Sequence, residues 1–140
     1  MKNIVKMEFS ANIANVTFAR GAVAAFVLDL DLTLNTINEI KTIVSEGVTN
    51  AIIHGYNKNE KDIVYLELYL ENDSLTIVIK DDGVGIENIE KAKEPLFTSK
   101  LSEERAGLGF TIMDIFSDSM EITSSLNEGT TVVCTKTLQI

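Results

Sequence analysis

Alternating apolar and polar residues predict five strands. Successive side chains of a strand point to opposite faces of a sheet, so apolar residues at every second position mark one buried face. The pattern occurs at residues 3–9, 63–71, 75–81, 120–123 and 130–138. We expect the first strand at an edge of the sheet, and the last two in a hairpin around an Asn-Glu-Gly turn.

Apolar residues at steps of three and four, together with turn signals, predict helices over residues 12–30, 36 to about 54, 88–93 and 108–116. The second helix opens with Thr-Ile-Asn-Glu at Thr36, which is the pattern of a capping box. Gly55 fits a C-terminal cap for the same helix. The chain therefore mixes strands and helices over its whole length.

The length and composition predict one globular domain over residues 1–140. Apolar residues make up 45% of the chain, but there is no apolar run of about 18 residues, so we expect no membrane contact. The N-terminus lacks the apolar core of a signal peptide, and the single cysteine, Cys134, cannot form an internal disulfide. These features favour a cytoplasmic protein.

The charge argues against nucleic-acid binding. The chain carries 12 basic and 21 acidic residues, for a net charge of −9, and has no basic run. Nucleic-acid binding needs clustered Lys and Arg to neutralise phosphates. We therefore expect no direct contact with DNA or RNA. Zinc is also disfavoured, because one His and one Cys are too few ligands.

Asp81 is the first candidate for chemistry. It ends a predicted strand on the same face as the apolar residues, so the pattern points a carboxylate towards the core, where it is costly without hydrogen bonds. Gly83 and Gly85 follow, and glycine lets a flat ligand approach the backbone. The alternative is a hairpin turn with an exposed Asp, but no strand begins after Gly85. Thr130 has inward parity on its own strand, so it could share a ligand with Asp81.

Glu46 and Asn50 lie four residues apart and so on one face of the second predicted helix, among isoleucines. One interpretation is a half-exposed, ordinary polar pair. The other is a carboxylate base beside an amide oxygen that ligates Mg²⁺, which keeps several waters and needs few protein ligands. The residues alone leave both interpretations open.

A glycine pair at the start of the last predicted helix is the third candidate. Gly107-x-Gly109 leaves backbone N–H groups free at a helix N-terminus, which favours phosphate, although such glycines also serve simple packing. Lys100 and Arg105 could add positive charge there. The preceding segment, about residues 86–106, is a long mixed stretch of the kind that is often functional or mobile.

Arg20 is the fourth candidate. It is the only basic residue between Lys6 and Lys41, and its helical neighbours are small or apolar. A solvated surface charge is the ordinary interpretation. An anchor for an acidic protein partner is the alternative, because Arg is enriched among the residues that dominate binding energy.

Taken in order, these signals resemble the GHKL ATPase superfamily: Glu46-x-x-x-Asn50, Asp81-x-Gly83-x-Gly85, Gly107-x-Gly109 and Gly129-Thr130-Thr131. A closer resemblance covers nearly the whole chain. The segments at residues 18–20, 45–56, 95–98 and 109–113 look like the anti-sigma-F factors of sporulating bacteria, the stage II sporulation protein AB family.

The resemblance implies a fold and an activity. The implied fold is an α+β two-layer sandwich, with a mixed, mostly antiparallel sheet covered on one face by helices (the Bergerat ATP-binding fold). The implied protein is a homodimeric serine kinase that uses ATP and Mg²⁺, binds and inhibits sigma factor F, and phosphorylates an anti-anti-sigma protein. Residues 86–106 would be a mobile lid over the nucleotide.

The same resemblance implies roles for single residues. Asp81 would accept a hydrogen bond from the adenine amino group with Thr130 beside it, and Gly83 and Gly85 would shape that pocket. Asn50 would ligate Mg²⁺. The residues that would bind phosphates under the lid are Lys100, Arg105, Gly107, Leu108 and Gly109.

The remaining implied roles concern catalysis and partners. Glu46 would act as general base towards the serine hydroxyl, and Arg20 would contact both protein partners. Larger relatives need a transducer or helical dimerisation domain, for which 140 residues leave no room. Two alternatives stay open: a related kinase controlling a general-stress sigma factor, and a nucleotide-gated sigma-binding module without catalysis.

Overall fold

The computed structural model describes residues 2–56, 59, 61–94 and 108–139. The elements follow in the order β1 (Lys2–Ser10), α1 (Asn15–Phe26), η1 (Leu28–Leu30), α2 (Leu34–Asn50), η2 (Ala51–Gly55), β2 (Ile63–Glu71), β3 (Ser74–Asp81), α3 (Ile89–Ala92), α4 (Gly109–Phe116), β4 (Ser119–Ser125) and β5 (Gly129–Thr137). η1 is a 3₁₀ turn and η2 is a single π-helical turn.

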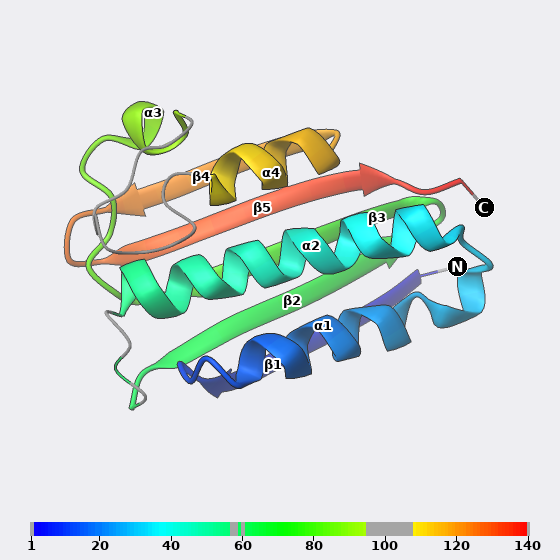
Figure 1. The fold of residues 1–140 in the computed structure, drawn as a ribbon, viewed down its shortest axis with the longest axis horizontal. Coiled ribbons are helices and arrows are strands. Elements are labelled where there is room, and N and C mark those ends of the chain that lie inside the picture. The colour runs from blue at the N-terminus through cyan, green and yellow to red at the C-terminus, as the bar shows by residue number, and fades with distance from the viewer. Residues whose placement is uncertain (1, 57–58, 60, 95–107, 140) are drawn as a thin grey trace.

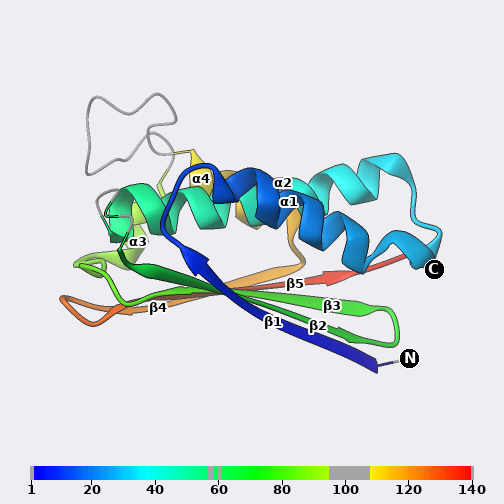
Figure 2. The ribbon, with the colours of Figure 1, turned by 90° about the horizontal axis from the view of Figure 1, so that it is seen from below.

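The strands form one five-stranded sheet in the order β1-β2-β3-β5-β4. Its four ladders are all antiparallel, so β1 lies at one edge, as expected, and β4 at the other. Helices α1, α2 and α4 cover one face of the sheet, and no described helix covers the other face (Figures 1 and 2). The predicted two-layer α+β class is confirmed.

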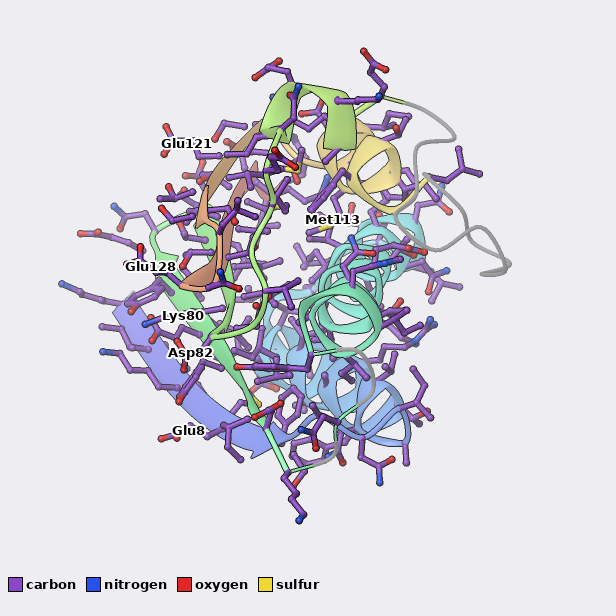
Figure 3. The ribbon with its side chains drawn as sticks, turned by 90° about the vertical axis from the view of Figure 1, so that its left-hand side faces the viewer. Glu8, Lys80, Asp82, Met113, Glu121 and Glu128 are labelled. Carbon is purple, nitrogen blue, oxygen red and sulfur yellow. The ribbon has the colours of Figure 1, made fainter. Side chains whose placement is uncertain are left out.

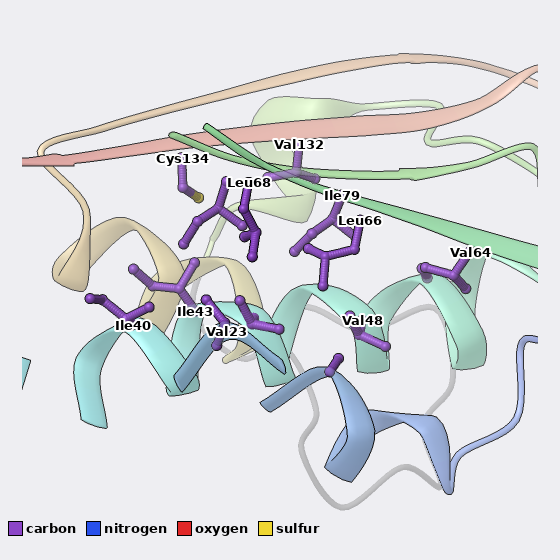
Figure 4. Packing of buried hydrophobic residues seen from close by; sticks show 14 of the residues in the cluster. Val23, Ile40, Ile43, Val48, Val64, Leu66, Leu68, Ile79, Val132 and Cys134 are labelled. Atoms are coloured by element: carbon purple, nitrogen blue, oxygen red, sulfur yellow. The ribbon is translucent and has the colours of Figure 1, made fainter. Parts of the chain in front are cut away.

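The core lies between α2 and the sheet. The apolar residues at every second position of β2 and β3 are at most 2% exposed, as the alternation in the sequence predicts. Ile43 and Val48 of α2 are fully buried and belong to the same apolar cluster as Leu66 of β2 (Figure 4). Each such side chain contributes about 1.5–3 kcal/mol by leaving water. None of the described helices is both long and apolar enough to cross a bilayer.

The start of α2 differs from the prediction. The helix begins at Leu34, and its N-cap is Thr33, whose Oγ accepts a hydrogen bond from the backbone N–H of Thr36 at 3.2 Å. The predicted box at Thr36 is therefore wrong by one turn. Thr33 has extended backbone angles, φ −68° and ψ 156°, as a cap requires. It lacks the Glu three residues later that made Thr36 the stronger candidate in the sequence.

Two helix ends also differ. The first helix ends at Phe26, and the chain continues as the short turn η1 up to Asp31, which has a left-handed φ of 55°. Gly55 is not a left-handed cap. It is the last residue of η2, and the described glycines with positive φ are Gly85 and Gly129.

Candidate functional site

Asp81 lies at the end of β3 and faces the helices. Its side chain is 5% exposed, and the backbone N–H of Gly83 donates to Oδ1 at 2.9 Å. Burial raises the pKa of the Asp81 carboxyl to about 6, against the opposing effect of the Gly83 and Thr130 backbone N–H groups. The fold thus holds a carboxylate in a place where its charge is unfavourable, which is more typical of binding sites than of structural contacts.

The turn after Asp81 is attached to η2 on one side. The backbone N–H of Asp82 donates to the Tyr56 hydroxyl, and the N–H of Val84 donates to the Gly55 carbonyl at 2.9 Å. The Tyr56 hydroxyl in turn donates to the Ile63 carbonyl at 2.7 Å. Burial, the largest effect, raises the pKa of Tyr56 to about 12, so the hydroxyl keeps its proton. The π-turn that follows α2 therefore holds this loop in place.

The same turn is attached to the β4–β5 hairpin on the other side. The backbone N–H of Asn127 donates to the Val84 carbonyl at 2.7 Å, and the N–H of Ile86 donates to Ser124 Oγ at 2.7 Å. Figure 3 looks onto this end of the molecule, with Lys80, Asp82 and Glu128 on the sheet side and Met113 on the helix side.

Both glycines of the turn are needed for contacts within the chain. A Cβ at Gly83 would lie 2.0 Å from the Gly55 carbonyl oxygen, and one at Gly85 would lie 2.1 Å from the Ser125 carbonyl oxygen. Gly85 also has a φ of 77°, which side-chain-bearing residues rarely adopt. The sequence predicted that these glycines let the backbone turn and let a flat ligand approach. The structure shows the close approach of backbone to backbone, and the ligand contact stays a prediction.

Thr130 is the direct cross-strand partner of Asp81 in the β3–β5 ladder, and it is 8% exposed. The two side chains therefore lie side by side on the helix-covered face, as their parity predicted. Thr130 Oγ lies 2.8 Å from Ser124 Oγ on β4. Sequence analysis missed Ser124, although pairing the hairpin about its Asn-Glu-Gly turn would have set it opposite Thr130.

Glu46 and Asn50 occupy the last two turns of α2. Glu46 is 2% exposed, so the interpretation as a half-exposed ordinary pair is wrong for this residue. Asn50 is half-buried and contacts the start of α4, because a Cβ at Gly109 would lie 2.8 Å from Asn50 Nδ2 and 3.0 Å from Oδ1. An amide oxygen and a helix N-terminus thus meet at one place.

Part of the predicted phosphate site and lid lies outside the described residues, namely Lys100, Arg105, Gly107 and residues 95–106. Leu108, 40% exposed, precedes α4. The predicted short helix is present as α3, with the Asn88 side chain as its N-cap.

Arg20 lies exposed on α1, beside α2. Its Nη1 is 3.4 Å from Ser45 Oγ, and Ser45 immediately precedes Glu46. The structure thus brings the candidate partner residue next to the turn of α2 that holds the candidate base.

Comparison with known proteins gives consistent matches. The family described as "Histidine kinase-like ATPase domain" matches residues 9–136. The anti-sigma F factor of Geobacillus sp. (strain WCH70) is 52% identical over 97% of this chain and 93% of that protein. The anti-sigma F factor of Clostridium perfringens (strain SM101 / Type A) is 48% identical over 97% of each chain.

Two solved structures show the same fold at low identity. The RsbU and RsbW domains of Rv1364c from Mycobacterium tuberculosis match 97% of this chain and 32% of that one, with a TM-score of 0.69 at 16% identity. The mycobacterial sensor histidine kinase MprB matches 99% of both chains, with a TM-score of 0.60 at 15% identity.

Proposed function

Because the chain belongs to the anti-sigma F factor family of histidine kinase-like ATPase domains, we propose that it is an ATP-dependent anti-sigma factor. In this proposal it binds and inhibits sigma factor F and phosphorylates a serine of the anti-anti-sigma factor. It acts in the cytoplasm as a homodimer. The observation that carries the nucleotide part of the proposal is the buried pair Asp81 and Thr130, held at the end of the sheet by backbone hydrogen bonds.

The chemistry of this pair suits the amino group of adenine. A carboxylate accepts hydrogen bonds and donates none. Asp81 is 5% exposed, and burial makes the charged form of its carboxyl group unfavourable. A ligand N–H group that donates a hydrogen bond would stabilise that charged form. The narrow contacts around Gly83 and Gly85 fix where the turn runs, and so set one wall of the pocket.

The place where Asn50 meets α4 suits phosphates and a hard cation. A helix N-terminus presents unpaired N–H groups and a partial positive charge, which favour anions. Asn50 offers a neutral amide oxygen, and Mg²⁺ accepts a few protein oxygens together with water and phosphate. The Gly109–Asn50 contact leaves no room for a Cβ, so the backbone at Gly109 comes close to that amide. Lys100, Arg105, Gly107 and Leu108 complete the phosphate contacts in this proposal.

Glu46 is the proposed general base. Mg²⁺-ATP supplies the phosphoryl group, and phosphoryl transfer needs mainly positioning and charge neutralisation from the protein. Glu46 stands one helical turn before Asn50, on the same side of α2, where its carboxylate would accept the proton of the serine hydroxyl. Arg20, hydrogen-bonded to Ser45, would hold a protein partner against that turn.

The test is a phosphorylation assay with purified protein, Mg²⁺-ATP and the anti-anti-sigma partner. Wild type should yield phosphoserine, whereas Glu46→Gln, which keeps the size of the buried side chain, should bind ATP and yield none. Wild type that binds ATP and the sigma factor but never phosphorylates would contradict the kinase and leave a nucleotide-gated binding module. Co-purification with the sigma factors of the cell should recover sigma factor F, and recovery of a general-stress sigma factor instead would contradict that assignment.

A further inference from the structure

Ser124 has three hydrogen-bond partners at the edge of the candidate nucleotide site. Its Oγ lies 2.7 Å from the backbone N of Ile86, 3.0 Å from the carbonyl oxygen of Gly129 and 2.8 Å from Thr130 Oγ. Ser124 lies on β4, directly opposite Thr130, and is half-buried. It thus links the loop after Asp81 to the hairpin that carries Thr130.

The chemistry of these partners sets the direction of the bond to Thr130. A serine hydroxyl has one hydrogen to donate and two lone pairs that accept. The Ile86 N–H can only donate, and the Gly129 carbonyl can only accept, so the Ser124 hydrogen goes to Gly129. All three bonds form together only when the Thr130 hydroxyl donates to Ser124 Oγ.

This arrangement leaves Thr130 Oγ with its lone pairs towards the site and its hydrogen directed away. Asp81, the cross-strand neighbour of Thr130, presents a second acceptor on the same face. We propose that Ser124 is a positioning residue that sets nucleobase specificity: by holding the Thr130 hydrogen, it makes the site a pair of acceptors that takes an amino-bearing purine and rejects a keto-bearing one. This proposal rests on the proposed function, because it concerns the same nucleotide site.

A purely structural role predicts a different result. If Ser124 only held the loop at Ile86 in place, its loss would lower the affinity for every purine nucleotide by the same factor. If it also directs the Thr130 hydrogen, its loss frees that hydrogen to turn towards the ligand and donate to a keto oxygen. The ratio of two affinities separates these roles, whereas a single affinity does not.

The experiment measures the affinities of the full-length protein for ATP and for inosine 5′-triphosphate, which carries a keto oxygen in place of the amino group. Wild type should prefer ATP. Ser124→Ala should lower the ratio of the ATP affinity to the inosine triphosphate affinity by about fivefold, the effect of one neutral hydrogen bond. Ser124→Thr, which keeps the hydroxyl, should restore the wild-type ratio. The matched control Ser119→Ala removes the same group from the exposed start of β4 and should leave the ratio unchanged.

A double-mutant cycle tests whether Ser124 acts through Thr130. Thr130→Val removes both the donor and the acceptor, so adding Ser124→Ala to it should change the ratio no further. Should Ser124→Ala fail to fold, Ser124→Cys gives the same comparison, because a thiol is a weak acceptor.

Two results would overturn the inference. One is an equal loss of affinity for both nucleotides in Ser124→Ala, and the other is a ratio that still changes on the Thr130→Val background. Wild type that binds no ATP would instead overturn the proposed function, so the two failures are distinguishable.

Discussion

Gly55 and Asp81 are so close that a Cβ at position 55 would lie 2.7 Å from the Asp81 carboxyl carbon. The contact joins the end of η2 to the end of β3, two segments far apart in sequence. It explains why the residue at position 55 is a glycine even though its φ is not left-handed. The absence of a side chain there makes room for the buried carboxylate.

Gly55→Ala should therefore displace the Asp81 carboxylate. We expect a loss of roughly 1–3 kcal/mol in the free energy of unfolding, as for other overpacked core positions, and a weaker nucleotide affinity. Denaturant unfolding and nucleotide titration check the two effects. The matched control is Gly21→Ala in α1, where an added Cβ meets nothing within 4 Å. It should stabilise the protein by about 0.5–1 kcal/mol, and an equal loss in both variants would contradict the steric explanation.

Asp81→Asn should separate binding from stability. The amide presents donors where the site needs acceptors, so nucleotide affinity should fall by at least about tenfold, the cost of a charged hydrogen bond. The pKa of Asp81 is raised from 3.8 to about 6. A shift of this size means that the ionised carboxylate destabilises the ligand-free folded protein by about 3 kcal/mol at neutral pH. The variant should thus be no less stable than wild type at pH 7.5. Near-normal affinity, or a large loss of stability, would contradict this assignment of Asp81.

The same pKa predicts two opposite pH effects. The folded protein binds the Asp81 proton more tightly than the unfolded chain does. Protonation of Asp81 therefore adds to the free energy of unfolding in full below pH 3.8, and this contribution is lost as the pH rises through about 6. Ligand binding needs the carboxylate, so affinity should instead fall by about tenfold per pH unit below pH 6. Adenosine is the suitable probe, because it has no phosphate that titrates in this range.

Asp118 supplies the control for this pH dependence. A hydrogen bond from the backbone N–H of Thr137, at 2.6 Å, holds the pKa of Asp118 below its usual value, so it is already ionised across the range tested. Asp118→Asn should leave the slope of adenosine affinity against pH unchanged. A flat profile between pH 5 and 7 in wild type would show that Asp81 does not carry the dependence.

Arg20→Glu should weaken the binding of protein partners and leave ATP affinity unchanged. Arg20 is exposed on α1, and its Nη1 lies 3.4 Å from Ser45 Oγ rather than beside Asp81 or Thr130, so we expect the adenine pocket not to depend on its charge. We expect a loss of about 2 kcal/mol or more in the sigma-factor complex, the size of a dominant interface residue. Titration of both ligands into one preparation checks this, and parallel losses would indicate a folding defect.

Local patterns in the sequence predicted the inward direction of Asp81 and Thr130, because side-chain parity along a strand is a local property. They did not predict what surrounds those residues. The role of Gly55 depends on η2 meeting β3, and the role of Ser124 depends on the register of the hairpin. The predicted helix start was wrong because Thr36, with a Glu three residues later, carries the fuller capping-box signal, whereas the chain places Thr33 at the cap.

The π-helical turn η2 bears on how the site depends on chain length. The backbone N–H of Tyr56 donates to the Ala51 carbonyl, five residues back, so η2 holds one residue more than an α-helical turn. Deleting one residue between Ala51 and Gly55 would therefore restore an ordinary helix and keep Tyr56 near the loop after Asp81. Deleting one from the regular part of α2 would instead rotate Gly55 and Tyr56 away from that loop by about 100°. The extra residue of η2 thus need not be present for the attachments of the ligand loop, whereas the helical register of α2 must be kept. Single-residue deletions in η2 and in α2, compared by nucleotide binding, should show this difference.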